Sequence, residues 1–476
     1  MKATPINPNH KNRAIGCLVG QAVGDALGAP YEFGRAGAFG KDNPVGSRDE
    51  MKGGGSFGWE PAEFTDDTQM AWVLAQFVLS GTPGTERLFQ DWKTWSRTAR
   101  DVGGATSRAL SYPGSRESFV ACSKNPEASR GNGVVMRVSP IGIAGSIEGL
   151  KWAETMARAQ AIVTHHDKRT VEASVIASVA MAGLISGQFT TFIDAFHVAI
   201  HEHVDPEMRT YFLNLISGDV DSTDATNFHG DICLRDAFWS LCSTECYEDA
   251  VRHAINLGGD ADTVGAVTGA LAGAMYGMQT IPARWATHVH GYVNGERIGL
   301  EDLQRVAANL SGFTWKDRSP DYGGPLGPKM VHWAGVYAAN LAGVEKTPDE
   351  YAVVSLCRTF GATDHFTDRT QFYLIDERRA NPQLAEVVAE AVNTIEEYIR
   401  AGKKVIVHCH AGRSRTGLIL KAWYMHAEGK YHEEAHDWLT HNWPHYTKSN
   451  EDFSIHLNHL TFHHAVFGHK HYNKSI

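Results

Sequence analysis

The chain has 476 residues, a length typical of two or three domains, which excludes a single small module. Hydrophobic residues make up 43% of the sequence and charged residues 21%, a composition that excludes a mainly disordered chain. The formal net charge of −10 argues against a large nucleic-acid-binding surface, so any anionic ligand has to be bound by a local pocket.

The cysteines and the apolar segments indicate the cellular compartment of the protein. The 7 cysteines are scattered along the chain, and an odd number of them fits no disulfide framework. The apolar run near the N-terminus imitates a signal peptide, but Gln21 and Asp25 interrupt it. Residues 171–185 contain Glu172 and are too short to span a bilayer. We therefore expect a cytoplasmic protein without a membrane partner.

Residues 1–314 form the first predicted domain. Up to about residue 312, Gly- and Ala-rich helical patterns alternate with polar loops, and β-branched runs suited to strands are scarce. This part of the sequence predicts an all-α domain.

Residues 315–329 crowd proline, glycine and charge together, as an interdomain linker does. In the predicted second domain, residues 330–476, the apolar runs 351–357 and 404–409 have the composition of buried strands. A helical pattern over 381–400 separates them, and this alternation predicts an α/β domain. The fold class expected of the whole chain is thus multidomain, all-α followed by α/β.

Two glycine ladders with i, i+4 spacing occur in the first domain. Their members are Gly16, Gly20, Gly24 and Gly28, then Gly265, Gly269, Gly273 and Gly277. Each glycine inside a helix destabilises it by about 1 kcal/mol relative to alanine. Close packing of the two helices is an interaction that can offset this cost. We predict two tightly packed helices whose adjoining loops meet in space.

Two acidic motifs lie beside these ladders. Phe64–Thr68 (FTDDT) and Gly258–Thr263 (GGDADT) each open a helical pattern. Taken singly, each motif is better explained by ordinary N-cap residues. Taken together, four converging carboxylates would repel one another without a cation, and oxygen ligands without Cys or His suit Mg²⁺ or Mn²⁺. The pair of motifs predicts a site for two adjacent divalent cations.

At these residues the sequence resembles the ADP-ribosylglycohydrolase family, over about residues 12–310. The motifs that carry the resemblance are GDALGAPYEF (24–33), FTDDT (64–68), GNGVVMR (131–137), THHD (164–167) and GGDADT (258–263). The resemblance implies an all-α fold with a dinuclear Mg²⁺ or Mn²⁺ centre that removes ADP-ribose from an acceptor. The implied metal ligands are Thr65, Asp66, Asp67, Asp260, Asp262 and Thr263.

The resemblance further implies that Glu32 is the acidic residue on a mobile loop beside the ligand. It implies that Asn132, Gly133 and His165 line the ADP-ribose. In this chemistry the cations orient the ribose hydroxyls and a water, while a carboxylate such as Glu32 or Asp67 moves a proton. Alone, Gly-Asn-Gly is as often a plain turn, and a single histidine is more often a buried, satisfied side chain.

A second constellation is the Cys-x₅-Arg loop 409–415, which lies between the strand pattern 404–409 and a helical pattern. Amides at the start of a helix favour a thiolate on Cys409 and bind an oxyanion. Arg415 can grip two phosphoryl oxygens with its planar fork. Thr416 can hydrogen-bond the sulfur when it leaves, and His408 helps to organise the loop. A buried cysteine in an ordinary turn is the alternative, and the ordered Cys, Gly, Arg and Thr disfavour it.

This loop resembles that of the cysteine-dependent tyrosine and dual-specificity phosphatases, over about residues 330–465. The resemblance implies a phosphocysteine intermediate and a general acid on a separate loop before Cys409. Asp376 is the candidate acid and Glu377 the second choice. His410 and Arg413 either select a polyanionic substrate or face solvent, and the sequence leaves these alternatives open.

The sequence therefore predicts a bifunctional hydrolase. The expected cofactors are two divalent cations, and the expected partners are an ADP-ribosylated protein, nucleic acid or metabolite and a phosphorylated substrate. In one alternative, the first domain is a non-catalytic ADP-ribose reader that targets the phosphatase. In another, the second domain only binds phosphate.

Overall fold

The computed structural model describes residues 8–44, 47, 50–218, 227–315, 323–447 and 450–459. The chain divides into two compact units. The first contains residues up to Ile281 together with His288–Trp315, and the second contains Pro282–Thr287 together with the chain from Lys316 onward. Within the predicted linker, residues 316–322 lie outside the described residues, and Lys329 is already the first residue of a strand.

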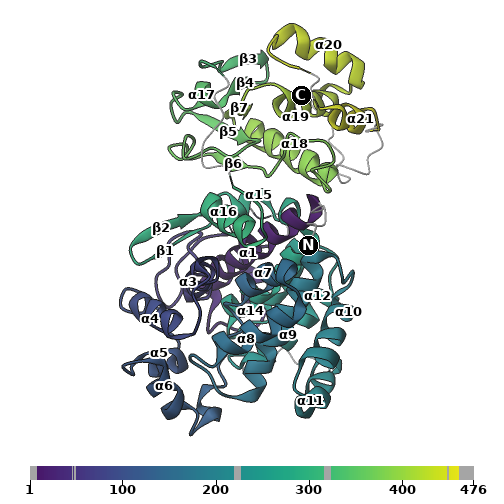
Figure 1. The fold of residues 1–476 in the computed structure, drawn as a ribbon. Coiled ribbons are helices and arrows are strands. Elements are labelled where there is room, and N and C mark those ends of the chain that lie inside the picture. The colour runs from purple at the N-terminus through teal and green to yellow at the C-terminus, as the bar shows by residue number, and fades with distance from the viewer. Residues whose placement is uncertain are drawn as a thin grey trace. The chain divides into compact units, whose positions relative to one another are not determined.

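The first unit is helical, as predicted (Figure 1). Its longer helices are α1 (Pro8–Gly28), α2 (Ala38–Asp42), α3 (Asp66–Ser80), α4 (Glu86–Trp95), α5 (Gly104–Leu110), α6 (Ser115–Cys122), α7 (Ser139–Glu148), α8 (Leu150–Ala161), α9 (Lys168–Ser186), α10 (Phe192–Val198), α11 (Pro206–Ser217), α12 (Gly230–Cys242), α13 (Tyr247–Asn256), α14 (Ala261–Tyr276) and α16 (Leu300–Leu310). The unit also contains an antiparallel hairpin, β1 (His290–Val293) with β2 (Glu296–Gly299), which the sequence analysis did not predict.

Helices α1 and α14 pack against each other through the two glycine ladders, which confirms that prediction. A Cβ added at Gly20 would lie 2.3 Å from the carbonyl oxygen of Gly269, and one added at Gly24 would lie 2.0 Å from that of Gly265. The neighbours are backbone atoms, so no side-chain movement could make room. This packing brings the end of α1 beside the start of α14, where the GGDADT motif lies.

The close approach of these helices gives a stability prediction. We expect Gly269→Ala to destabilise the first unit by about 2 kcal/mol or more, because the new Cβ would lie 2.1 Å from the backbone oxygen of Gly20. Denaturant unfolding of the intact chain, followed by tryptophan fluorescence, measures the change. Gly104→Ala is the matched control, since a Cβ there meets nothing within 4 Å. Equal stability of the two variants would contradict tight packing of α1 on α14.

Helix α9 corrects one expectation from the sequence. The helix has 19 residues, so it extends beyond the stretch 171–185, and among the described helices it is long and apolar enough to cross a membrane. Of its apolar window, 89% is buried inside the protein. The core helix of a globular domain meets the same length and composition criteria, so these criteria alone do not identify a membrane span.

The second unit contains a five-stranded sheet with helices, the α/β architecture that the sequence predicts. The strand order is β3-β4-β7-β5-β6, with β3 antiparallel to β4 and the other neighbours parallel. The strands are β3 (Lys329–His332), β4 (Val336–Asn340), β5 (Tyr351–Ser355), β6 (Arg369–Gln371) and β7 (Lys404–Cys409). The helices are α15 (Ala283–Ala286), α17 (Leu341–Val344), α18 (Leu384–Arg400), α19 (Ser414–Glu428), α20 (His432–Asn442) and α21 (Glu451–His459).

The side chains of β7 alternate between two apolar clusters because successive residues of a strand point to opposite faces. Val405, Val407 and Cys409 belong to the cluster with α18 and α19, whereas Ile406 belongs to a smaller cluster. Apolar side chains therefore pack on both faces of β7, which explains why the sequence of residues 404–409 is a nearly continuous apolar run. Cys409 ends this buried central strand and so has a fixed position.

Candidate functional sites

A cavity of about 380 Å³ lies in the first unit. It is lined by Glu32, Phe33, Asp66, Asp67, Asp101, Val102, Gly103, Gly104, Ala105, Thr106, Gly131, Asn132, Gly133, Met136, His165, Phe228, Asp260, Asp262 and Thr263. Of the candidate residues that the sequence identified in this domain, all but Thr65 line the cavity. They come from segments up to 231 residues apart in the chain, so the fold gathers them at one place.

The two acidic motifs meet through Asp67. Its Oδ2 lies 3.3 Å from the hydroxyl of Thr65 and 3.5 Å from that of Thr263, which belongs to α14. Its Oδ1 is buried and has no hydrogen-bond partner. Thr65 is thus behind the cavity wall but bonded to a residue that lines it. An unpartnered buried carboxylate oxygen between two hydroxyls is the environment that a hard cation would satisfy.

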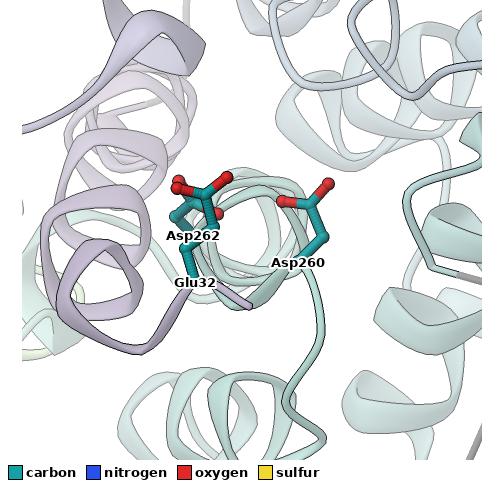
Figure 2. A group of neighbouring side chains, drawn as sticks. All are labelled: Glu32, Asp260 and Asp262. Atoms are coloured by element: carbon teal, nitrogen blue, oxygen red, sulfur yellow. The ribbon is translucent and has the colours of Figure 1, made fainter. Parts of the chain in front are cut away.

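Three further carboxylates converge at the N-terminal end of α14 (Figure 2). One oxygen each of Glu32, Asp260 and Asp262 lies within 4.8 Å of the others, close enough to ligate one ion. Glu32 follows the short 3₁₀ helix Ala29–Tyr31, which comes directly after α1, and its Oε2 is buried without a hydrogen-bond partner. The carboxylates of these residues fit the divalent cations that the resemblance of the sequence implies.

The helix starts contradict the ordinary N-cap explanation of the two motifs. Neither Thr65 nor Asp260 caps its own helix with its side chain. Asp25 of α1 does this for α3: its carboxylate accepts from Thr65 N (2.9 Å), Thr68 N (3.0 Å) and Thr68 Oγ1 (2.6 Å). Because Asp25 satisfies the helix amides, the carboxylates of Asp66 and Asp67 are left for the cavity.

The Gly-Asn-Gly loop supports the acidic cluster. Asn132 Nδ2 donates to Asp260 Oδ2 (2.7 Å) and to Asn227 O (3.2 Å), and its backbone amide donates to Phe228 O (3.0 Å). The amide of Asn132 is therefore already used within the protein and is not free to bind a ligand. Gly133 packs closely on His165, whose Cε1 and Nε2 would lie 3.2 and 3.3 Å from an added Cβ.

Sequence reasoning missed Asp25, Asn227 and Asp101. Asn227 joins the two loops, since its Oδ1 accepts from Asp260 N (3.0 Å) and its Nδ2 donates to Gly258 O (2.8 Å). Asp101 lines the cavity from the loop before α5. Asp25 belongs to the motif GDALGAPYEF, so the sequence contained a signal that could have identified it. Asn227 and Asp101 lie in loops that contain no recognisable motif.

An aromatic pair at the cavity was also missed. Phe33 and Phe228 stack with ring centroids 5.6 Å apart and an interplanar angle of 12°. Phe33 is 58% exposed and has a φ of +64°, a backbone conformation that side chains disfavour. An exposed aromatic face in the wall of a polar cavity can stack against a planar ring of a ligand.

Burial and mutual repulsion raise the pKa values of the cavity carboxylates. Desolvation, then neighbouring carboxylates, raise the pKa of Glu32 to about 8, and desolvation followed by Asp260 raises that of Asp101 to about 6. Desolvation and repulsion also raise the pKa values of Asp66, Asp67 and Asp262 well above the usual range. The ionised forms of these carboxyl groups repel one another, and bound cations would remove that repulsion. Cation binding would therefore displace the protons that the carboxyl groups otherwise hold.

These shifts predict a pH-dependent effect of cations on stability. A carboxyl whose folded pKa lies above its unfolded value of about 4 loses folding stability as pH rises from that value to the folded pKa. Without a cation, the first unit should thus lose stability between about pH 4 and pH 8, the folded pKa of Glu32. Saturating Mg²⁺ should raise its unfolding temperature by about 5 °C or more.

Calorimetry of the intact chain with Mg²⁺, and with NaCl of equal ionic strength, measures this effect at pH 6 and pH 8. We expect the larger rise in unfolding temperature at pH 8. An equal response to both salts would contradict a cation site in the cavity.

The Cys-x₅-Arg loop of the second unit lies between β7 and α19, as the sequence predicts. Cys409 is 1% exposed. The loop is anchored because Trp443 Nε1 donates to Gly412 O at 2.6 Å and Leu341 N donates to His410 O at 3.2 Å. Gly412 has a φ of +65°, and a Cβ there would lie 2.7 Å from a backbone oxygen, so this position requires glycine.

Arg415, the last residue of this loop, is buried and is held by main-chain oxygens. Its Nη1 donates to the carbonyl oxygens of Leu356 and Leu374, each at 3.1 Å. Its Nε lies 3.7 Å from Asp376 Oδ2. The structure thus brings the candidate acid Asp376 to the arginine. Asp376 and the second choice, Glu377, are both exposed.

The remaining loop residues have distinct surroundings. His408 is buried, its Nε2 lies 2.7 Å from Ser355 Oγ, and desolvation lowers its pKa to about 3. Thr416 Oγ1 is buried without a hydrogen-bond partner, so it does not bond Cys409 in this state. His410 Nε2 donates to Arg358 O (2.9 Å), and desolvation lowers the pKa of His410 to about 4. His410 is therefore uncharged at neutral pH, so of the pair His410 and Arg413 only Arg413, which is exposed, carries a positive charge.

Comparison with known proteins relates both units to hydrolases. Residues 6–317 match the ADP-ribosylglycohydrolase family, and the chain belongs to it. Residues 354–460 match the catalytic domain of dual specificity phosphatases.

Three relatives illustrate the first match. The chain is 28% identical to ADP-ribosyl-[dinitrogen reductase] glycohydrolase of Rhodospirillum rubrum, over 61% of this chain and 94% of that protein. It is 29% identical to ADP-ribosylarginine hydrolase Tri1 of Serratia proteamaculans, over 58% of this chain and 74% of that protein. A solved ADP-ribosylglycohydrolase-related protein complex is 30% identical with a TM-score of 0.50, covering 64% of this chain and 99% of that one.

Proposed function

We propose that the chain is a bifunctional enzyme that removes ADP-ribose from an acceptor with two divalent cations, Mg²⁺ or Mn²⁺, and hydrolyses a phosphate monoester through Cys409. The observation that carries the first activity is the convergence of two distant acidic motifs on one cavity, with Asp67 between Thr65 and Thr263. The second rests on the anchored loop between β7 and α19 with Arg415 beside it.

In the first reaction, the bond between C1″ of the ribose and the acceptor breaks while a water oxygen bonds to C1″. Bound divalent cations would supply Lewis acidity to the water and the ribose hydroxyls. Glu32 and Asp101 line the cavity as carboxyl groups outside the two acidic motifs, so Glu32 is placed to protonate the leaving acceptor and Asp101 to accept the proton of the water. Asp67 would hold a cation, and the Phe33–Phe228 pair offers a face for a nucleobase.

The charge of the cavity favours an arginine-linked acceptor. Six of its described lining residues carry carboxylates, and none is a lysine or arginine. Two divalent cations leave this set of carboxylates with a net negative charge, which favours a guanidinium as the leaving group over a neutral hydroxyl or an anionic group. The Tri1 relatives are named as ADP-ribosylarginine hydrolases, in agreement with this proposal.

In the second reaction, the Cys409 thiolate attacks phosphorus, and the ester oxygen leaves with a proton from Asp376. Water then hydrolyses the phosphocysteine, and Thr416, whose hydroxyl is unpartnered, stabilises the departing sulfur. Arg415 binds the phosphoryl oxygens. The exposed Arg413 is available for a second anionic group of the substrate. The cysteines that the structure describes form no disulfide with one another, which supports a cytoplasmic location for a thiol-dependent enzyme.

The test is to incubate the intact protein with Mg²⁺ and a peptide that carries ADP-ribose on arginine, and to measure free ADP-ribose by mass spectrometry. A serine-linked peptide is the matched control. We expect release from the arginine-linked peptide. Release from the serine-linked peptide alone would refute the acceptor, whereas binding of both peptides without release would favour the alternative, an ADP-ribose reader.

A further inference from the structure

Hydrogen bonds link a buried arginine to the histidine that lines the cavity. Arg137 Nη2 donates to Thr164 Oγ1 at 2.9 Å, and Thr164 Oγ1 lies 2.8 Å from His165 Nδ1. The three residues are between 0% and 1% exposed. Within the part of the chain that the structure describes, Thr164 Oγ1 has no other hydrogen-bond partner, so its hydroxyl serves these two groups alone.

The number of available protons sets the direction of these bonds. A guanidinium only donates, so Thr164 Oγ1 accepts from Arg137. The hydroxyl has one proton of its own, and His165 Nδ1 is the acceptor within reach. If Nδ1 carried a proton and donated it instead, the hydroxyl proton would be buried without an acceptor, which is unfavourable. Nδ1 therefore accepts, and in the neutral ring the proton lies on Nε2.

The other ring nitrogen faces the Gly-Asn-Gly loop. His165 Nε2 lies 3.5 Å from the position of a Cβ at Gly131 and 3.3 Å from that of one at Gly133, and both glycines line the cavity. Among the described residues Nε2 has no hydrogen-bond partner. A buried donor aimed at a cavity wall built of glycines is available to a bound ligand.

Arg137 is itself fixed in place. Its Nε donates to Gln160 Oε1 at 2.7 Å, its Nη2 also donates to Gln160 O at 3.1 Å, and its Cζ lies 3.8 Å from the centroid of the Trp92 ring. Desolvation, and then the positive charge of Arg137, lower the pKa of His165 well below its usual value. His166 and Arg108 are the other titratable and charged groups that act on the ring, and both act in the same direction.

We propose that Arg137 and Thr164 are positioning residues that hold His165 as the neutral Nε2–H tautomer, a fixed hydrogen-bond donor to a phosphoryl or ribose oxygen of the ligand. His165 then orients the ligand and does not carry protons in the reaction. Only the identity of the ligand, ADP-ribose, rests on the proposed function.

The direct test is nuclear magnetic resonance of the intact protein labelled with ¹⁵N-histidine, without substrate, between pH 6 and pH 8. The His165 signals are identified by their loss in His165→Gln. We expect an unprotonated Nδ1 and a protonated Nε2 at every pH. An imidazolium or an Nδ1–H tautomer would overturn the proposal, whether or not the protein hydrolyses ADP-ribosylated substrates.

Two variants test the role of Thr164. Thr164→Val removes the hydroxyl and keeps the shape, so the single tautomer should be lost and ADP-ribose should bind roughly two- to tenfold more weakly. KM should rise more than kcat falls. Thr164→Ser restores the hydroxyl and should restore both the tautomer and the affinity. If valine leaves the tautomer unchanged, Thr164 is not a positioning residue.

If Thr164→Val does not fold, the spectra of the wild type and of Thr164→Ser test whether His165 is a single Nε2–H tautomer. In that case a mixture of tautomers in either protein would overturn the proposal. A wild type that binds no ADP-ribose but shows the Nε2–H tautomer would refute the proposed function and leave the tautomer assignment in place.

Discussion

Asp67→Asn is expected to lower the glycohydrolase activity by about 10²- to 10⁴-fold, because a lost cation ligand removes several kcal/mol of transition-state stabilisation. Asp67 lies between the hydroxyls of Thr65 and Thr263, and its second oxygen is unpartnered. Asparagine keeps the shape of the side chain and removes its charge. Release of ADP-ribose from an arginine-linked peptide, followed over a range of Mg²⁺ concentrations, measures the loss.

Two controls separate loss of the site from loss of the fold. Asp42→Asn changes an exposed aspartate at the end of α2 and should keep full activity. Hydrolysis of an aryl phosphate by Asp67→Asn should stay within about twofold of the wild type if the two sites act independently. Near-normal glycohydrolase activity of Asp67→Asn at saturating Mg²⁺ would show that the acidic cluster is not the catalytic centre.

Cys409→Ser is expected to lower the phosphatase activity by about three orders of magnitude or more and to leave ADP-ribose release intact, because a serine hydroxyl in the same place is a far weaker nucleophile than a thiolate. Cys409 is buried at the end of β7 and is followed by the loop that leads into α19. The rate of aryl phosphate hydrolysis, together with mass spectrometry of a trapped phosphocysteine in the wild type, measures the effect.

The matched control is Cys357→Ala, which changes another buried cysteine of the same apolar cluster and should keep the activity within about threefold. Cys409→Ser should still bind phosphate, since Arg415 and the loop amides are unchanged. If the wild type binds phosphate esters but forms no phosphocysteine, the second domain is a phosphate-binding module.

Local patterns in the sequence were sufficient to predict the position of the Cys-x₅-Arg loop and the packing of two helices. The Cys-x₅-Arg loop could be placed between a strand and a helix because its residues are consecutive, and their tasks depend on local backbone geometry. The glycine ladders predicted the packing of α1 on α14 because only glycine lets two helix backbones approach so closely, with Gly24 against Gly265 as one example. The hairpin β1–β2 was missed because its strands are 4 residues each, too short for a reliable alternation pattern.

Only the tertiary structure decided which side chains share the first cavity and what state they are in. Asp25 caps α3 across 40 residues of sequence, so the local motif could not reveal that Thr65 is spared that task. Asp101 and Asn227 join the site from loops without a pattern of their own, because contacts between distant segments leave no periodic signal. The pKa of Glu32 rises to about 8 through burial and the carboxylates that the fold places around it, and burial does not exist before the chain has folded.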